Sequence, residues 1–287
     1  MKFSIPLHRL PALSRWSLAL ALVLSTALAT PLRSVADRDD SSDDWTKGTP
    51  DFEWSGALKA NQSVTIKGVN GRIIAGTTSG DKVEVRAWKH ANRSDPAEVK
   101  IEMTTDENGI TVCALYPAPS GSTPNTCEAG DHTHMNVKDN DDVQVRFVVR
   151  VPAGIGFNAH NVNGGVTAIG LTGPVKARTV NGAVEIVTSG RAEASTVNGS
   201  IHASLGASSW TDPVKFETVN GGIHLSVPTT LNADVDCSTV NGSIESDLPW
   251  LVKGRIGRTH VEGTFNKGGS PLRISTVNGS IEINSGT

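Results

Sequence analysis

The chain has 287 residues, a formal net charge of −3 and only 5% aromatic residues. This length allows one or two domains, and the 29 glycines suit short strands and turns better than a helical bundle. A mildly acidic chain lacks the positive surface on which nucleic-acid binding depends, so no nucleic-acid partner is predicted.

Residues 1–36 have the pattern of a secretory signal peptide. Basic residues precede an apolar core at residues 16–28, which is too short to span a bilayer comfortably, and small-x-small cleavage sites end at Ala29 and Ala36. Cleavage after Ala36 leaves 22 basic and 29 acidic residues, a formal charge of −7, and no transmembrane segment. We expect an exported protein in the periplasm, at the cell surface or outside the cell; the alternative is an uncleaved anchor.

Residues 37–50 are predicted to be an acidic, disordered linker, since the run at 37–44 is almost entirely Asp and Ser. Residues 51–152 then predict a β region. The tetrapeptide at 106–109, Asp-Glu-Asn-Gly, predicts the turn of an antiparallel hairpin. Alternation of apolar and polar residues predicts strands at residues 63–67, 82–88, 99–103, 110–115 and 143–149.

Two of the three cysteines, Cys113 and Cys127, bracket a loop rich in Pro, Gly and Ser. We expect them to form a disulfide, which would contribute roughly 3 kcal/mol by closing a loop of this size. The alternative is a pair of free thiols near a metal, although no further Cys or His completes a zinc site. Cys237 is left over.

A His- and Asp-rich stretch at residues 131–142 could hold a divalent ion, but its ligand spacing matches no defined site. A polar loop between strands is therefore the favoured interpretation. No metal site and no cofactor are predicted.

The rest of the chain is organised by one recurring corner. The hexapeptide Thr-Val-Asn-Gly-Ser-Ile at residues 196–201 recurs at 239–244 and 276–281, and looser copies surround it. Such an array must be interpreted before anything else. Asn and Gly both tolerate positive φ, which we take as their role in the corner. The corner residues are Asn70, Gly71, Asn163, Gly164, Asn181, Gly182, Asn198, Gly199, Asn220, Gly221, Asn241, Gly242, Asn278 and Gly279.

Alignment of the repeats on Asn predicts which residues face the core. The third and fifth positions after Asn, and the fourth and sixth before it, are small to medium apolar residues, so both sets should face inward. Cys237 falls in one of these inward columns. The fourth position after Asn should face outward, as a solvated face or as a stripe that binds metal or a protonatable partner. Its ionisable members are Glu185, His202, His224, Glu245 and Glu282.

Two architectures fit a period of two strands and two turns. One is an antiparallel meander with Asn-Gly hairpin turns; the other is a parallel β-solenoid with stacked corners. We favour the all-β parallel solenoid because the Thr-Val flanks recur with the corner. Residues 153–287 would form the array and residues 51–152 would cap one end. A degenerate copy is expected near residues 254–263, no C-terminal cap is visible, and Thr and Val cannot both face inward.

The Thr-Val-Asn-Gly repeats resemble an exported bacterial family of β-strand-repeat domains of unknown function labelled "putative adhesin". The segments at residues 69–71, 112–117 and 149–152 match it as well, so the resemblance covers about residues 50–287. It implies an all-β, solenoid-like exported protein, and it supplies no catalytic residues.

These observations favour a non-enzymatic exported repeat protein, an adhesin or cell-envelope scaffold, that binds an unknown protein or glycan through its outward face. One alternative is a polysaccharide-acting enzyme on a β-helix, which would need paired carboxylates. The other is a metal-binding envelope sensor module that uses the Glu/His column or the loop at 131–142.

Overall fold

The computed structural model describes residues 47–130, 135–138, 141–206, 209–252 and 257–286; the predicted signal peptide and most of the acidic linker lie outside them. The described chain is all-β, with one sheet of ten strands, called sheet A here, and one of eleven strands, called sheet B. A 3-10 turn, η3, spans Pro96–Glu98. The strands are β1 (Phe52–Gly56), β2 (Ser63–Lys67), β3 (Ile73–Thr77), β4 (Val83–His90), β5 (Lys100–Asp106), β6 (Gly109–Leu115), β7 (Gln144–Val151), β8 (Gly156–His160), β9 (Val166–Leu171), β10 (Val175–Arg178), β11 (Val184–Thr188), β12 (Ala192–Ser195), β13 (Ile201–Leu205), β14 (Val214–Glu217), β15 (Ile223–Pro228), β16 (Ala233–Ser238), β17 (Ile244–Ser246), β18 (Trp250–Val252), β19 (His260–Phe265), β20 (Ser270–Ser275) and β21 (Ile281–Gly286).

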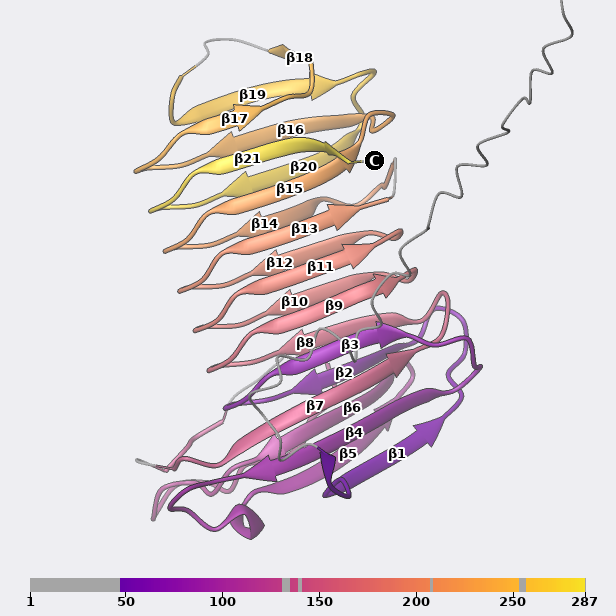
Figure 1. The fold of residues 1–287 in the computed structure, drawn as a ribbon, viewed down its shortest axis with the longest axis vertical. Helices are drawn as coiled ribbons and strands as arrows, with labels where there is room; N and C mark the ends of the chain where they lie inside the picture. The colour runs from indigo at the N-terminus through magenta and orange to yellow at the C-terminus, as the bar shows by residue number, and fades with distance from the viewer. Residues whose placement is uncertain (1–46, 131–134, 139–140, 207–208, 253–256, 287) are drawn as a thin grey trace, which may run out of the picture.

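The predicted parallel solenoid is confirmed. Each coil places one strand in sheet B and the next in sheet A, and equivalent strands pair in parallel and in register: β10 with β8 and β12, and β11 with β9 and β13. Figure 1 shows these coils stacked along the long axis of the molecule. A meander is excluded because these neighbours run parallel rather than antiparallel.

The core lies between the two sheets and consists of the predicted inward columns. Val184 and Ile186 after the corner, and Ala177 before it, are fully buried, as are their equivalents in most coils. Burying one such Val or Ile side chain contributes about 1.5–3 kcal/mol. Cys237 is buried in its predicted column, and burial, with a smaller contribution from the Asp236 charge, raises the pKa of its thiol to about 12. This thiol therefore stays protonated and packs as a small apolar residue.

The corner asparagines form a ladder of side-chain hydrogen bonds. Every ladder Asn except Asn70 donates from its Nδ2 to the Oδ1 of the Asn in the adjacent coil, for example from Asn198 to Asn181 at 2.8 Å. The bonds range from 2.7 to 2.9 Å. In spatial order the ladder consists of Asn70, Asn163, Asn181, Asn198, Asn220, Asn278 and Asn241.

The predicted role of positive φ at the corner is wrong for most of these residues. No ladder Asn has positive φ, and among the corner glycines only Gly71, Gly164 and Gly182 do. Close approach of the coils explains the glycine instead, because a Cβ on Gly199 would lie 2.0 Å from the carbonyl oxygen of Gly182. Asn is present for its side-chain amide and Gly for its lack of a side chain.

The structure decides which of the Thr and Val columns faces inward. The motif threonines are buried, and each hydroxyl donates to a corner glycine carbonyl of the adjacent coil, as Thr196 does to Gly182 at 3.0 Å. The motif valines are exposed and form a ridge along the corner. A buried carbonyl left without a donor would cost about 1–3 kcal/mol, so the hydroxyl of Thr suits this position better than the isosteric Val.

Both ends of the array depart from chain order. The coil β2–β3 lies between β8–β9 and β6–β7, so residues 63–77 continue the stack. At the other end, the coil β20–β21 lies between β14–β15 and β16–β17 (Figure 1). Asn278 therefore precedes Asn241 in the ladder, and Glu282 precedes Glu245 in the outward column.

Antiparallel strands cover the N-terminal end of the stack in both sheets and its C-terminal end in sheet B. β4 pairs with β7 and β1, and β5 pairs with β6, at one end; β19 pairs with β16 and β18 at the other. The expectation of a degenerate copy near residues 254–263 is wrong for the described part, because β19 runs antiparallel to its neighbours. The expected absence of a C-terminal cap is wrong for sheet B, where β19 and β18 cover β16, whereas β17 is the edge strand of sheet A. Because an uncovered parallel edge would offer unpaired backbone groups, these strands protect the edges that they cover from pairing with another chain.

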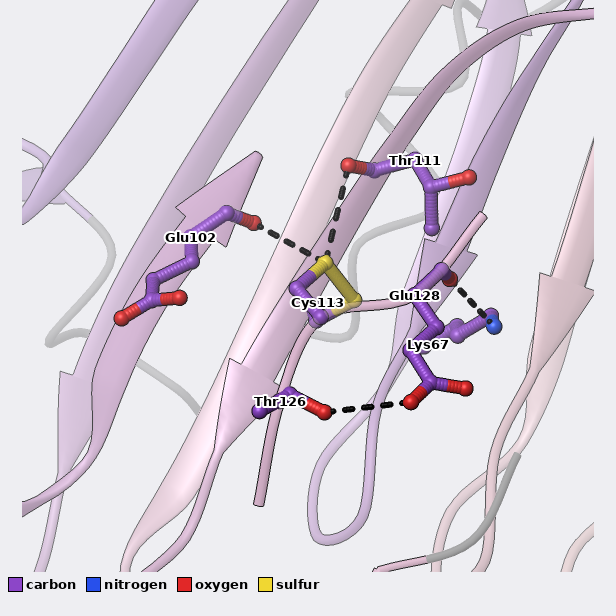
Figure 2. Close-up of a disulfide and its surroundings, with 7 residues drawn as sticks. Lys67, Glu102, Thr111, Cys113, Thr126 and Glu128 are labelled. Carbon is purple, nitrogen blue, oxygen red and sulfur yellow. Dashed lines mark hydrogen bonds between the residues drawn. A yellow bond between two sulfur atoms is a disulfide. The ribbon is translucent and has the colours of Figure 1, made fainter. Parts of the chain in front are cut away.

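The N-terminal region contains the predicted hairpin, β5–β6, with Asp106 opposite Gly109. The predicted disulfide between Cys113 and Cys127 is present, with a Cα–Cα distance of 5.6 Å. As Figure 2 shows, the segment that it anchors lies over the outer face of β2, where Lys67 Nζ donates to the Glu128 carbonyl at 2.8 Å. Lys67 is buried as a result. The disulfide thus holds a cover over one end of sheet B.

We predict that the interior of the Asn ladder contributes more to stability than its end. Asn198 makes two ladder bonds, to Asn181 and from Asn220, whereas Asn241 makes one, to Asn278. At about 1 kcal/mol per bond, Asn198→Ala should lower the free energy of unfolding by about 2 kcal/mol and Asn241→Ala by about half of that. Urea denaturation measures both. Equal effects, or an unchanged melting temperature in the double variant, would contradict a structural role for the ladder.

Candidate functional site

The predicted outward column forms one continuous row across five strands of sheet A. Strand registers place Glu185 beside His202, His202 beside His224, His224 beside Glu282 and Glu282 beside Glu245. All five side chains are exposed or half-buried. Sequence alignment identified the members correctly, but their spatial order depends on the inserted coil β20–β21.

The two histidines at the centre of the column are aligned with each other. Their rings stack with centroids 4.7 Å apart and an interplanar angle of 5°. Glu282 flanks them on one side, with its Oε2 3.0 Å from His224 Nδ1. Since a carboxylate only accepts hydrogen bonds, this contact places a proton on Nδ1 of His224.

The column ends in a pair of carboxylates. Glu282 and Glu245 are direct neighbours in register, which places like charges side by side. Their partners draw them apart, since Glu282 contacts His224 while Glu245 Oε1 accepts from Ser243 Oγ at 3.1 Å. A hollow of about 230 Å³ opens beside the histidines, with Glu185, Ser204 and Asn284 also in its wall.

A larger groove of about 1050 Å³ adjoins this hollow and shares Glu185 and His202 with it. It runs along the Asn ladder toward the N-terminal end and is lined there by Arg72, Gln144 and Arg146. Sequence reasoning missed these three residues because they belong to irregular coils outside the aligned repeats. The alternation of β7 alone could have marked its two members as outward-facing.

Asp142 closes the far end of this groove. Hydrogen bonds lower its pKa to about 2: first that from the Ser94 backbone amide, at 2.8 Å, then those with the Ser94 side chain and the Arg93 guanidinium. The side chain is therefore a carboxylate that joins the segment directly before β7 to the segment after β4. It supports the groove wall.

The opposite face, on sheet B, carries a column of mixed charge. Lys176, Glu193 and Lys215 alternate on neighbouring strands. Near the C-terminal end, the side chains of Asp236, His260 and Glu262 gather so that one ligand atom of each lies within 4.8 Å of the others. Sequence reasoning missed this cluster because β19 departs from the repeat.

The loop at residues 131–142 and His160 lie outside the outward column. Residues 131–134 and 139–140 of the loop at 131–142 are outside the described chain, so its metal-binding alternative stays a prediction. His160, which lies shortly before the corner at Asn163, is a buried residue of β8. Within the described residues, no helix is long and apolar enough to cross a membrane.

Comparison with known proteins finds matches to a family model and to solved structures. No curated protein matches the chain. Among solved structures it is similar to a "putative cell adhesion protein" from Clostridium sporogenes ATCC 15579, with 12% identity, a TM-score of 0.42, and coverage of 82% of this chain and 99% of the other. It is also similar to a "putative adhesin" from Bacteroides fragilis NCTC 9343, with 9% identity, a TM-score of 0.24, and coverage of 82% and 96%.

The family model described as Toastrack DUF4097 matches residues 171–284. That span begins at the end of β9 and runs through the stacked coils into β21. The β-repeat family that the Thr-Val-Asn-Gly corners predicted is therefore confirmed over residues 171–284, where the chain matches Toastrack DUF4097.

Proposed function

We propose that this chain is a non-enzymatic, exported β-repeat protein that binds a protein or glycan of the cell envelope through the outer face of sheet A. The Cys113–Cys127 disulfide supports an oxidising compartment, as expected for an exported protein. The binding surface is the column from Glu185 to Glu245 together with the groove that adjoins it.

One observation carries this proposal: the column is unfavourable for the fold itself. Like charges directly opposite each other on neighbouring strands destabilise a sheet, yet Glu282 and Glu245 are such neighbours. Sheet B also has such pairs, Lys215 beside Arg273 and Asp236 beside Glu262, but the column of sheet A is the one that shares Glu185 and His202 with the groove of about 1050 Å³. Departures from local stability occur at functional sites, so the column is suited to a partner that supplies the missing positive or hydrogen-bond-donating groups.

The shape of the surface also favours an extended partner. The column repeats at the strand spacing, about 4.8 Å, and continues into a groove rather than a closed cavity. A basic protein segment or an amino-sugar polymer can follow such a row, donating a hydrogen bond or a positive charge at successive strands. Rows of this kind bind by accumulating several weak contacts.

The test compares two variants with the same change in charge. In the column variant, Glu185→Gln, Glu245→Gln and Glu282→Gln are combined; in the control, Glu193→Gln, Glu217→Gln and Glu262→Gln are combined on sheet B. Binding of the secreted form to immobilised envelope polysaccharides and to isolated cell envelopes is measured by interferometry. We expect the column variant to lose at least tenfold in affinity and the control to lose less than twofold. Equal losses, or no binding by the unmodified protein, would refute the proposal.

A further inference from the structure

We infer that His202 and His224 form a binding site for one divalent transition-metal ion, such as Zn²⁺ or Cu²⁺, on the outer face of sheet A. The inference goes beyond the proposed binding of an envelope partner and does not depend on it. It rests on the relative placement of two imidazoles, one carboxylate and one glycine.

The two imidazoles are already arranged side by side. The strands β13 and β15 pair in parallel and in register, and the two rings are stacked, with centroids 4.7 Å apart and planes 5° from parallel. Two imidazole nitrogens that share a tetrahedral Zn²⁺ at about 2.0–2.1 Å lie roughly 3.3 Å apart. The two rings must rotate out of their parallel stack for both lone pairs to reach one ion, and both side chains can rotate because they lie at the surface.

Glu282 prepares one of these imidazoles for coordination. Its Oε2 lies 3.0 Å from His224 Nδ1, so the ring keeps its proton on Nδ1 and its lone pair on Nε2. A carboxylate behind a coordinating histidine is the usual outer partner in metal sites, where it orients the ring and strengthens the ligand. Glu282 is therefore a positioning residue rather than a ligand.

The coordinating atom faces a space without a side chain. A Cβ placed on Gly222 would lie 3.3 Å from His224 Nε2, so this nitrogen lies over the glycine. The adjacent coils carry Ser200 and Ser280 at the equivalent position. The hollow of about 230 Å³ beside the two rings leaves room for an ion and for the water molecules that complete its coordination.

The donor set selects the class of ion. Two imidazole nitrogens suit Zn²⁺, Cu²⁺ and Ni²⁺, whereas Mg²⁺ and Ca²⁺ require oxygen ligands. Glu185, in register with His202 on the other side, is placed to add one carboxylate oxygen. The cluster of Asp236, His260 and Glu262 on sheet B offers one nitrogen and two oxygens, so the two sites differ in a measurable way.

The experiment uses the secreted form of the full chain without a polyhistidine tag, and Zn²⁺ and Cu²⁺ alone as probes. Calorimetry with Zn²⁺ should show one equivalent bound at micromolar concentration. Electron paramagnetic resonance of the Cu²⁺ form should show hyperfine coupling to two nitrogens. Coupling to a single nitrogen, or no heat with Zn²⁺ at 100 µM, would overturn the inference.

Matched variants locate the ion. His202→Ala and His224→Ala should each weaken Zn²⁺ binding at least tenfold, and Glu282→Gln should weaken it by about tenfold through the loss of its charge. His260→Ala, Glu245→Gln and the double change of His132 and His134 to Ala should leave it unchanged. If a control abolishes binding and the His202 variant retains it, the ion lies elsewhere and the inference fails. None of these measurements involves an envelope partner. Failure of the metal-binding experiment therefore does not affect the proposed function, and failure of the envelope-binding experiment does not affect the metal site.

Discussion

Deletion of residues 270–287 is expected to unfold the C-terminal third of the array. A C-terminal truncation is usually mild when the last element lies on an edge, but β20–β21 is an interior coil, paired with strands on both sides. Its inward residues Leu272, Ile274, Ile281 and Ile283 are fully buried. At about 1.5–3 kcal/mol each, their loss is on the order of 10 kcal/mol, comparable to the whole stability of a domain.

The unfolding should stop partway along the molecule. Coils of a solenoid contact only their neighbours, so β16–β19 should lose protection while β8–β13 keep theirs in hydrogen exchange. Trp210 provides an optical signal, because its Nε1 donates to the Pro271 carbonyl at 2.9 Å and its backbone amide to Ser270 Oγ at 2.8 Å. Its emission should shift to longer wavelength in the truncated chain.

Two further measurements decide the origin of the effect. A synthetic peptide of residues 267–287 should restore both the protection and the Trp210 emission, since it can refill the vacant position. A control that replaces residues 249–256 with two glycines removes the outermost strand β18 and should leave β16 protected. Native-like protection of β16 and β17 in the truncated chain would contradict the insertion of β20–β21.

Gly221→Ala is expected to be among the most damaging single substitutions in the array, while Gly222→Ala, one residue later, should be tolerated. A Cβ on Gly221 would lie 2.0 Å from the carbonyl oxygen of Gly199 and 2.5 Å from its carbonyl carbon. Both are backbone atoms of the adjacent coil, so relief requires the coils to separate. Separation would also break the Thr218 hydroxyl bond to the same Gly199 carbonyl, now 2.9 Å. We expect a loss of more than about 3 kcal/mol.

Gly222 differs because its neighbours can yield. The atoms nearest to a Cβ there are His224 Nε2, the end of a movable side chain, at 3.3 Å and the Ser280 carbonyl oxygen at 3.4 Å. Ala183 and Ser200 occupy the equivalent position in other coils. The free energy of unfolding should therefore change by less than about 1 kcal/mol. Neither glycine has positive φ, so similar losses in urea denaturation of the two variants would refute close coil approach as the reason for the corner glycine.

The repeats predict the parts of this fold that depend on a local period. Asn-aligned columns assigned the inward residues, including Cys237, because side chains alternate across a strand and stacked coils bring equal positions together. The five outward residues were found for the same reason. Export stays a prediction, since residues 1–36 lie outside the described chain. The division of the chain at residue 152 and the identity of any partner are predictions as well.

What the sequence determined by itself is therefore the content of each coil: two strands, an Asn-Gly corner, and the residues that face inward or outward. Only the tertiary structure decided the order in which coils stack, because every coil presents nearly the same edge and nothing local distinguishes β21 from β17 as the neighbour of β15. It also decided that Thr rather than Val turns inward, since the glycine carbonyl that the hydroxyl satisfies belongs to another coil. Glu282 rather than Glu245 flanks the stacked pair of His202 and His224 because of that order.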